Sequence, residues 1–167
     1  MAQPRRSTDE DSGDMRGARV LVVEARFYDD IADELMRGAV AALQAAGATY
    51  ECYAVPGVFE IPAAIQMAIR SLDFSTLHGR FDGYVVLGCV IRGETTHYDL
   101  VSEQSARAIQ DLVLKYTLAL GFGIVTAENR DQAWARASVD DRDHGGRAAS
   151  ACLHMLDVKR QLLLFPR

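Results

Sequence analysis

The residues best suited to chemistry lie in the stretch Gly88–Asp99, which reads GCVIRGETTHYD. It follows the apolar run Tyr84–Leu87, which is typical of a buried parallel strand, and it precedes a long helical pattern. In open α/β sheets, ligands bind at the carboxyl ends of strands. Here the chain offers the imidazole of His97, two hydroxyls and free backbone N–H groups, while Gly88 and Gly93 allow unusual backbone angles and close approach of a ligand. Such groups could hold an anion and transfer a proton.

His97 is one of four histidines, and none of them has the spacing of a metal-binding motif. We therefore expect no metal site. A lone histidine is often a surface or capping residue, but the position of His97 after a strand favours a functional role. Cys89 lies eight positions earlier and suggests a nucleophile. Free cysteine is among the most buried residue types, so a small buried side chain at the strand end is the favoured interpretation.

Three aromatic residues, Phe27, Phe59 and Phe122, are expected at or near the same edge of the sheet. A lone ring is usually part of a core, but rings that follow strand ends could stack on an aromatic ligand. Farther along, Arg136 and His144 belong to a basic cluster within an acidic run. By itself that pattern is typical of a solvated junction between helices.

Composition excludes several classes of function. The formal net charge of −5 argues against nucleic acid as the main partner. No apolar run is long enough to span a membrane, and no secretory signal is expected. Three widely spaced cysteines fit a reducing cytoplasm rather than a disulfide framework. The phosphate-binding motifs G-x-G-x-x-G and Walker A are absent, as is the hydrolase motif G-x-S-x-G.

Strand and helix patterns alternate after a polar segment. Residues 1–16 predict a disordered tail and residues 17–167 one folded domain. Apolar runs predict strands over 19–25, 49–55, 83–90 and 121–126; helical spacing predicts helices over 31–47, 62–72, 100–117, 129–137 and 146 to the end. Gly47 is expected to end the first helix and Asn129 to cap the fourth. The fold class is therefore α/β, a three-layer α/β/α sandwich with a four-stranded parallel sheet, flavodoxin-like.

Four blocks of sequence, in this order, carry a specific resemblance: VEARF at 23–27, VPGVFEIP at 55–62, GCVIRGETTHY at 88–98 and FGIVTAEN at 122–129. They resemble lumazine synthase from about residue 18 to the end of the chain. Membership would imply the penultimate step of riboflavin synthesis. In that step 5-amino-6-(D-ribitylamino)uracil condenses with 3,4-dihydroxy-2-butanone 4-phosphate to give 6,7-dimethyl-8-ribityllumazine, phosphate and water. The resemblance implies no cofactor.

The resemblance also implies roles for residues at matching positions. His97 would transfer protons. The pyrimidine and its ribityl chain would contact Phe27, Val58, Phe59, Glu60, Cys89, Val90, Ile91 and Phe122, and the phosphate would contact Glu94, Thr95, Arg136 and His144. Two positions depart from the family: Cys89 stands where threonine is common, and His144 stands where lysine is common. Since histidine is partly charged near neutral pH, the second departure predicts weaker and more pH-dependent attraction for phosphate.

Members of that family form rings of five subunits that share their sites. The resemblance implies that Phe27, Phe59, Cys89 and His97 come from one subunit, and Phe122, Arg136 and His144 from the next. Members that build sixty-subunit shells tend to have a glycine in the linker between the last two helices. Here residues 137–143 contain no glycine and three carboxylates, which favours a free pentamer. Riboflavin synthase is a candidate partner.

The sequence is also compatible with other hypotheses about function. The chain could be a non-catalytic flavodoxin-like binding module, although a signalling receiver would carry an acidic pair where Arg26 stands. It could be a low-turnover relative that binds a flavin or a pyrimidine. A hydrolase that uses Cys89 and His97 is a third reading, which predicts loss of activity when Cys89 is alkylated.

Overall fold

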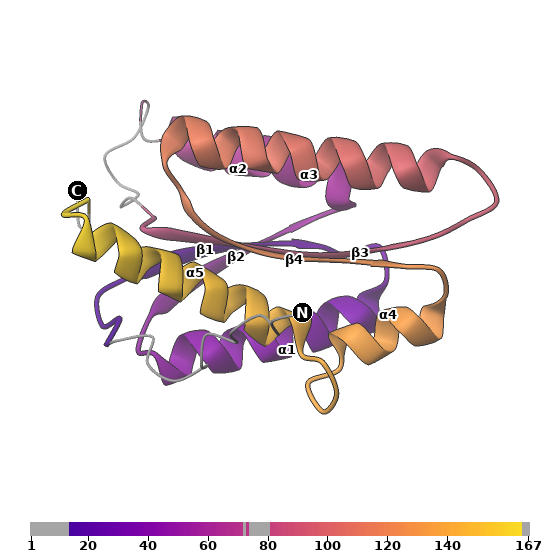
Figure 1. Cartoon of the computed structure of the whole chain (residues 1–167), viewed down its shortest axis with the longest axis horizontal. Coiled ribbons are helices and arrows are strands. Elements are labelled where there is room, and N and C mark those ends of the chain that lie inside the picture. Colours follow the sequence, from indigo (N-terminus) through magenta and orange to yellow (C-terminus); the bar gives the residue numbers. More distant parts are fainter. Residues whose placement is uncertain (1–13, 72, 74–80, 165–167) are drawn as a thin grey trace, which may run out of the picture.

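The protein folds into three layers, with a parallel sheet between two layers of helices (Figure 1). The computed structural model describes residues 14–71, 73 and 81–164. The strands are β1 (Arg19–Ala25), β2 (Thr49–Val55), β3 (Gly83–Ile91) and β4 (Ala119–Ala127). They lie in the order β2-β1-β3-β4, and every neighbouring pair is parallel. The predicted α/β/α sandwich with a four-stranded, flavodoxin-like sheet is confirmed.

Helices cover both faces of this sheet. Figure 1 shows α1 (Asp29–Ala45), α4 (Arg130–Ala137) and α5 (His144–Gln161) on one face, and α2 (Ile61–Ser71) and α3 (His97–Tyr116) on the other. A short 3-10 turn, η1 (Val58–Glu60), leads into α2. Because both faces are covered, alternate residues of β1 enter two different cores. Val20 and Val22 pack on the side of α1 and α5, and Leu21 and Val23 on the side of α2.

Two predicted helix ends are confirmed. Gly47 follows α1 with a φ of +74°, and its N–H donates to the carbonyl of Gln44 at 3.0 Å. The side chain of Asn129 caps α4 by accepting from the N–H of Gln132. The predicted end of α2 at Leu72 and the loop at 78–80 lie outside the described residues.

Four helices begin earlier than predicted, and the shifts in α3 and α5 bear on the candidate site. The helix α3 begins at His97 rather than Leu100, because its first turn is polar and lacks the apolar spacing used to recognise it. The helix α5 begins at His144 rather than Gly146. Its cap is Asp143, whose side chain accepts from the N–H of Gly146 at 2.9 Å. Both histidines singled out by sequence therefore stand at the first position of a helix.

The packing of α5 on β4 depends on two glycines. A side chain at Gly121 would place its Cβ 1.8 Å from the carbonyl oxygen of Ala148, and one at Gly123 would lie 2.9 Å from the Ala148 Cβ. The helix therefore rests directly on the backbone of the strand, which a larger residue would prevent. Phe122 lies between these glycines, so its side chain points to the opposite face of the sheet.

The folded part of the chain begins before residue 17. Met15 is fully buried, and its N–H donates to the carbonyl of Ala46 at 3.0 Å. Met15 therefore packs against the folded domain. Residues 1–13, where a disordered tail is expected, lie outside the described residues. Across the described ranges, no helix combines the length and the apolar character needed to cross a membrane.

Candidate active site

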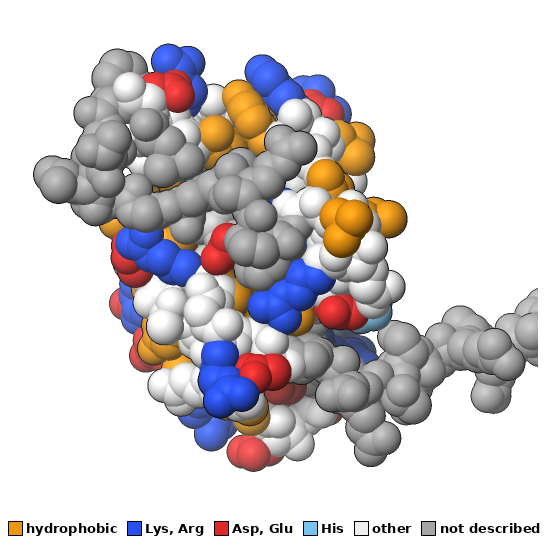
Figure 2. Space-filling view, turned by 90° about the vertical axis from the view of Figure 1, so that its left-hand side faces the viewer, with side chains coloured by type: hydrophobic (Ala, Val, Ile, Leu, Met, Phe, Trp, Pro, Cys, Tyr) orange, Lys and Arg blue, Asp and Glu red, His pale blue; other side chains and the backbone are white. Residues whose placement is uncertain are grey.

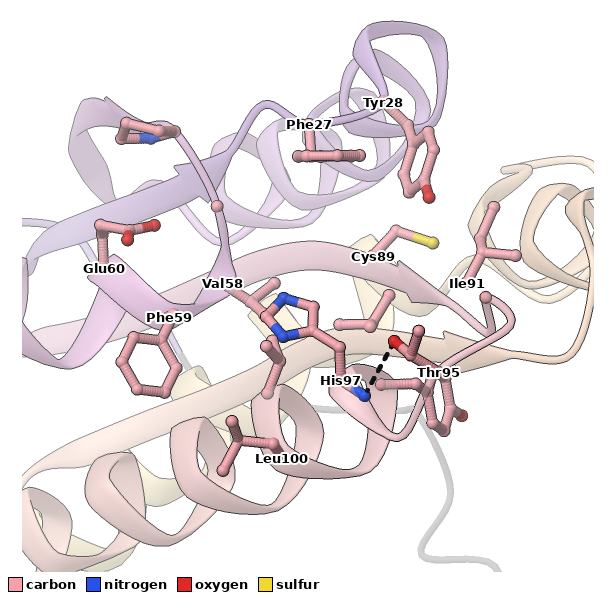
Figure 3. Close-up of a pocket in the computed structure, with 16 residues that line it drawn as sticks. Phe27, Tyr28, Val58, Phe59, Glu60, Cys89, Ile91, Thr95, His97 and Leu100 are labelled. Atoms are coloured by element: carbon pink, nitrogen blue, oxygen red, sulfur yellow. Dashed lines mark hydrogen bonds between the residues drawn. The ribbon is translucent and has the colours of Figure 1, made fainter.

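A cavity of about 550 Å³ opens at the carboxyl ends of β1, β2 and β3 (Figure 3). This edge of the sheet is where the sequence predicts a ligand site. We call this cavity the pocket. It is lined by Phe27, Tyr28, Pro56, Gly57, Val58, Phe59, Glu60, Cys89, Val90, Ile91, Gly93, Thr95, His97, Tyr98, Leu100 and Val101. The structure thus brings together nine of the predicted site residues, drawn from four separate segments of the chain.

Two exposed rings border the pocket. The side chain of Phe27, just after β1, is 70% exposed, and that of Phe59, in η1, is 54% exposed. They lie on different sides of the cavity in Figure 3, and the edge of Phe27 contacts Tyr28 with a centroid distance of 5.0 Å. Apolar rings of this size are normally buried. Their exposure at a concave site suits a flat aromatic ligand.

The turn after β2 supplies a carboxylate. Val58 is buried, and it fills the space that a side chain at Gly88 would occupy, since a Cβ there would lie 2.6 Å from the Val58 Cγ1. Glu60 is exposed at the edge of the pocket. A carboxylate so placed can accept hydrogen bonds from ligand hydroxyls.

The unusual backbone angles predicted for Gly88 and Gly93 are not found. Among the described glycines, φ is positive at Gly17 and Gly47 and not at Gly88 or Gly93. The strand β3 continues through Gly88 to Ile91 in extended conformation, so close packing is what requires a glycine there. A Cβ at Gly93 would meet no atom within 4 Å, which leaves the backbone open to a ligand.

Cys89 is a buried strand-end residue rather than a nucleophile. Its side chain is 7% exposed, and burial raises the pKa of its thiol to about 11. At neutral pH only about one molecule in 10⁴ would carry the thiolate. The structure therefore disfavours the hydrolase reading. Val90 and Ile91, half-buried at the end of the same strand, also line the pocket.

His97 is the titratable group best placed for proton transfer. It is exposed, and its imidazole extends into the pocket in Figure 3. Its backbone N–H donates to the Oγ1 of Thr95 at 3.3 Å. Thr95 precedes the start of α3, where backbone N–H groups favour an anion. Glu94, the other phosphate candidate of this loop, is exposed but does not line the pocket.

Three predicted site residues lie elsewhere, and we call Phe122, Arg136 and His144 the distal group. Phe122 stands in the middle of β4 opposite Val86 and is 46% exposed, so its predicted place at the strand-end edge is wrong. Because β4 continues to Ala127, five residues separate the ring from that edge. Arg136 lies in the last turn of α4, where its Nη1 donates to the carbonyl of Gln132 at 3.0 Å. None of the three lines the pocket.

His144 lies in a positive environment. Its Nδ1 is buried without a hydrogen-bond partner in the described part of the chain. Burial lowers the pKa of its imidazole, and the nearby charges of Arg147 and Arg136 lower it further. The neutral form therefore dominates at pH 7. A neutral imidazole among guanidinium groups can gain a proton when an anion binds, because the anion offsets their repulsion.

The sequence missed some residues of the pocket. Tyr28, Tyr98, Leu100 and Val101 line it without having been predicted. Leu100 and Val101 follow His97 by three and four positions, so a helix that begins at His97 places all three on one face. That spacing is the sequence signal that indicates their place in the pocket. For metals, no group of three or more His, Cys, Asp or Glu side chains within the described ranges could hold an ion.

Comparisons with known proteins agree on one family. The sequence model described as 6,7-dimethyl-8-ribityllumazine synthase matches residues 17–160. A protein of that name from Afipia carboxidovorans is 52% identical over 163 residues, or 97% of this chain and 98% of the relative. Rhodopseudomonas palustris has a 6,7-dimethyl-8-ribityllumazine synthase 1 with the same identity and coverage. A relative from Methylorubrum extorquens is 54% identical over 152 residues, which cover 91% of this chain and 87% of that protein. This chain therefore belongs to the 6,7-dimethyl-8-ribityllumazine synthase family.

Proposed function

We propose that this chain condenses 5-amino-6-(D-ribitylamino)uracil with 3,4-dihydroxy-2-butanone 4-phosphate to give 6,7-dimethyl-8-ribityllumazine, phosphate and water. The observation that carries the proposal is an apolar pocket, bordered by two exposed rings, with an exposed histidine at its edge, in a member of this family. The rings suit the pyrimidine, the carboxylate of Glu60 suits ribityl hydroxyls, and the imidazole suits proton transfer.

The chemistry needs alignment and proton movement more than a strong nucleophile. The 5-amino group of the pyrimidine attacks the ketone, one water leaves to form an imine, and phosphate is eliminated. The ribitylamino nitrogen then closes the ring with loss of a second water, which completes the product. Phe27 and Phe59 align the pyrimidine, and backbone groups of Cys89, Val90 and Ile91 contact its edge. His97 takes and returns protons during these steps. Thr95 and the N–H groups of its loop bind the phosphate, together with Glu94 through its backbone.

The distal group completes the site from a second copy of the chain. Phe122 is an exposed ring outside the pocket, and outside it too lie the positive charge of Arg136 and the imidazole of His144, which is neutral in the free protein at pH 7. A ring of subunits, each giving its pocket to one neighbour and its distal group to the other, joins all these residues. Arg136 then binds phosphate with its planar fork, and His144 adds a titratable contact.

The assembly proposed is a free pentamer. The linker between α4 and α5 lacks glycine, and Asp140 and Asp141 are exposed on it, so close contact between linkers would bring like charges together. Native mass spectrometry at neutral pH should show five chains. A dominant sixty-chain particle would contradict the argument from the linker, and an active monomer would contradict the shared site.

The reaction is tested by incubating the protein with both substrates. Lumazine absorbance and free phosphate should increase together, in equal amounts. Phosphate without lumazine, or neither product, would favour the alternative of a low-turnover flavin or pyrimidine binder. We place the reaction in the cytoplasm, which the unpaired state of Cys52, Cys89 and Cys152 supports. Riboflavin synthase remains a candidate partner on the resemblance alone.

A further inference from the structure

Arg92, the residue that follows β3, joins three segments of the chain. Its Nε donates to the Oε2 of Glu128 at 2.9 Å, just after β4. Its Nη1 and Nη2 donate to the carboxylate of Asp99, in the first turn of α3, at 3.4 and 3.2 Å. The guanidinium carbon lies 4.0 Å from the centre of the Tyr98 ring. The hydrogen bonds with Asp99 and Glu128 raise the pKa of Arg92, so its charge is permanent.

The segment that Arg92 holds is the one that carries His97. The backbone N–H of Arg92 donates to the carbonyl of Ala127 at 2.9 Å, which fixes the start of the loop to β4. The helix α3 begins at His97 without a side-chain cap at Thr96. Arg92 instead contacts this first turn from outside the helix, through an ion pair with Asp99 and through the ring of Tyr98. The exposed imidazole thus depends on a first turn whose orientation is set by this guanidinium.

Arg92 differs from an ordinary surface ion pair on the same helix. Arg107 pairs with Asp111 four residues away at 3.4 Å, and both side chains are about two-thirds exposed. Such a pair joins two positions that the helix already holds together, and its contribution is small. The side chain of Arg92 is 38% exposed, contacts two carboxylates and a ring, and joins segments that are far apart in sequence. A planar fork with two donor edges is needed for that geometry.

We propose that Arg92 is a positioning residue, which orients His97 in the pocket by holding Asp99 against Glu128. This inference rests on the proposed function, in which His97 transfers protons. Arg92 itself need not touch a substrate, since both of its edges already bind carboxylates. Its effect is therefore expected on the rate of the chemical steps, with the binding of the pyrimidine preserved by Phe27 and Phe59.

The test compares Arg92→Gln with Arg107→Gln in the assembled protein, with assembly checked by size. Arg92→Gln should lower kcat about tenfold or more, because small misplacements of catalytic groups are costly, and should change the KM for the pyrimidine less than about twofold. Arg107→Gln should leave both near the wild-type values. Arg92→Lys should recover part of the rate, since an ammonium can contact one carboxylate but cannot bridge two with a planar fork.

Dependence on His97 separates positioning from general stability. In a His97→Ala background, Arg92→Gln should cause no further loss of kcat, because the group that it positions is gone. Asp99→Asn should resemble Arg92→Gln, and the double variant should be no slower than the slower single one. Additive losses in either pairing would overturn the inference, as would an increased KM for the phosphate substrate at unchanged kcat. A wild-type protein without product would instead refute the proposed function, while an active wild type with equal Arg92→Gln and Arg107→Gln rates would refute the inference alone.

Discussion

The pocket and the distal group differ in how completely one chain builds them. In the pocket, four segments converge on a cavity with two exposed rings and a histidine (Figure 3). The distal group has a half-exposed ring on β4, and an arginine and a histidine near the junction of α4 and α5, and none of its members lines that cavity. Both exposed surfaces are unusual for a monomer. In the proposed assembly, the pocket and the distal group are two complementary halves of a site that two chains share.

The largest expected effect comes from mixing two defective variants. His97→Ala damages the pocket and Arg136→Ala damages the distal group, so each protein alone should be poorly active. In rings assembled from equal amounts of both, random assortment would give about one quarter of the sites two intact halves. Lumazine formation should recover to about that fraction of the wild-type rate.

The matched control for mixing uses two lesions in the same half. His97→Ala mixed with Phe27→Ala leaves every pocket damaged, so no activity should return. If the mixture of His97→Ala and Arg136→Ala also stays inactive while rings form, the two halves belong to one chain and the comparison is wrong.

Next in size is the effect of His97→Ala alone. Turnover should decrease by about a hundredfold or more, the usual scale for loss of a general acid–base group, while pyrimidine affinity stays close to that of the wild type. Steady-state rates and fluorescence titration would measure the two quantities. His154→Ala, an exposed histidine of α5, is the control and should change neither. Unchanged turnover in the His97 variant would remove this residue from the mechanism.

An effect confined to the binding of one substrate is expected from Arg136→Ala. Loss of a desolvated charged contact should weaken binding of the butanone phosphate by about 2–5 kcal/mol and change pyrimidine affinity little. The KM values of the two substrates, measured separately, give the comparison. Arg130→Ala, on the same helix and paired with Asp30, is the control. Equal increases in both KM values would assign Arg136 a structural role.

The smallest effect concerns pH and His144. Because its pKa is lowered in the free protein, His144 is neutral at pH 8 and gains a proton only below its ordinary value. Bound phosphate raises the pKa of His144, so the complex takes up a proton over a pH range in which the free protein does not. The KM for the butanone phosphate should therefore fall as the pH is lowered from about 8 towards 6.5. The lysine in His144→Lys stays charged throughout this range. The variant should therefore bind the butanone phosphate more tightly at pH 8, and its KM should vary less with pH. A wild-type KM that does not vary over this range would contradict the role of His144.

The lowered pKa of His144 also affects folding stability, which should decrease as the pH is lowered while phosphate binding becomes tighter. The unfolded chain takes up the proton at His144 more readily than the folded chain does. The free energy of unfolding is therefore highest above the ordinary pKa of histidine and decreases as the pH falls below it. Substrate phosphate should reduce this loss. Thermal unfolding at pH 8 and pH 6, with and without inorganic phosphate, would show the sign.

Much of the sheet was predictable from sequence because its strands are buried on both faces. Continuous apolar runs at β1 and β3 leave little choice of structure, and alternating strands and helices specify a parallel order. The start of α3 was harder to predict, because Asp99 and the neighbouring polar residues hide the helical period there. That error concealed the contribution of Leu100 and Val101 to the pocket.

The sequence predicts which residues belong to the candidate site, but not that the fold places some of them far from the pocket. Residues that follow strand ends, such as Phe27 and Phe59, can be placed by the rule for parallel sheets. The separation of His144 from His97 cannot be obtained in that way, because it depends on where α5 crosses the sheet. The hydrogen bond from Arg92 to Glu128 could not be predicted from the sequence either, since thirty-six positions separate the two residues.

The glycines of β4 have a further consequence for how two copies would meet. With α5 resting directly on the strand backbone at Gly121 and Gly123, the ring of Phe122 and the first turn of α5 belong to one stiff unit. Little freedom remains there to be lost when a second molecule arrives. Association would resemble the docking of two preformed surfaces, with most of the entropy of ordering already spent during folding.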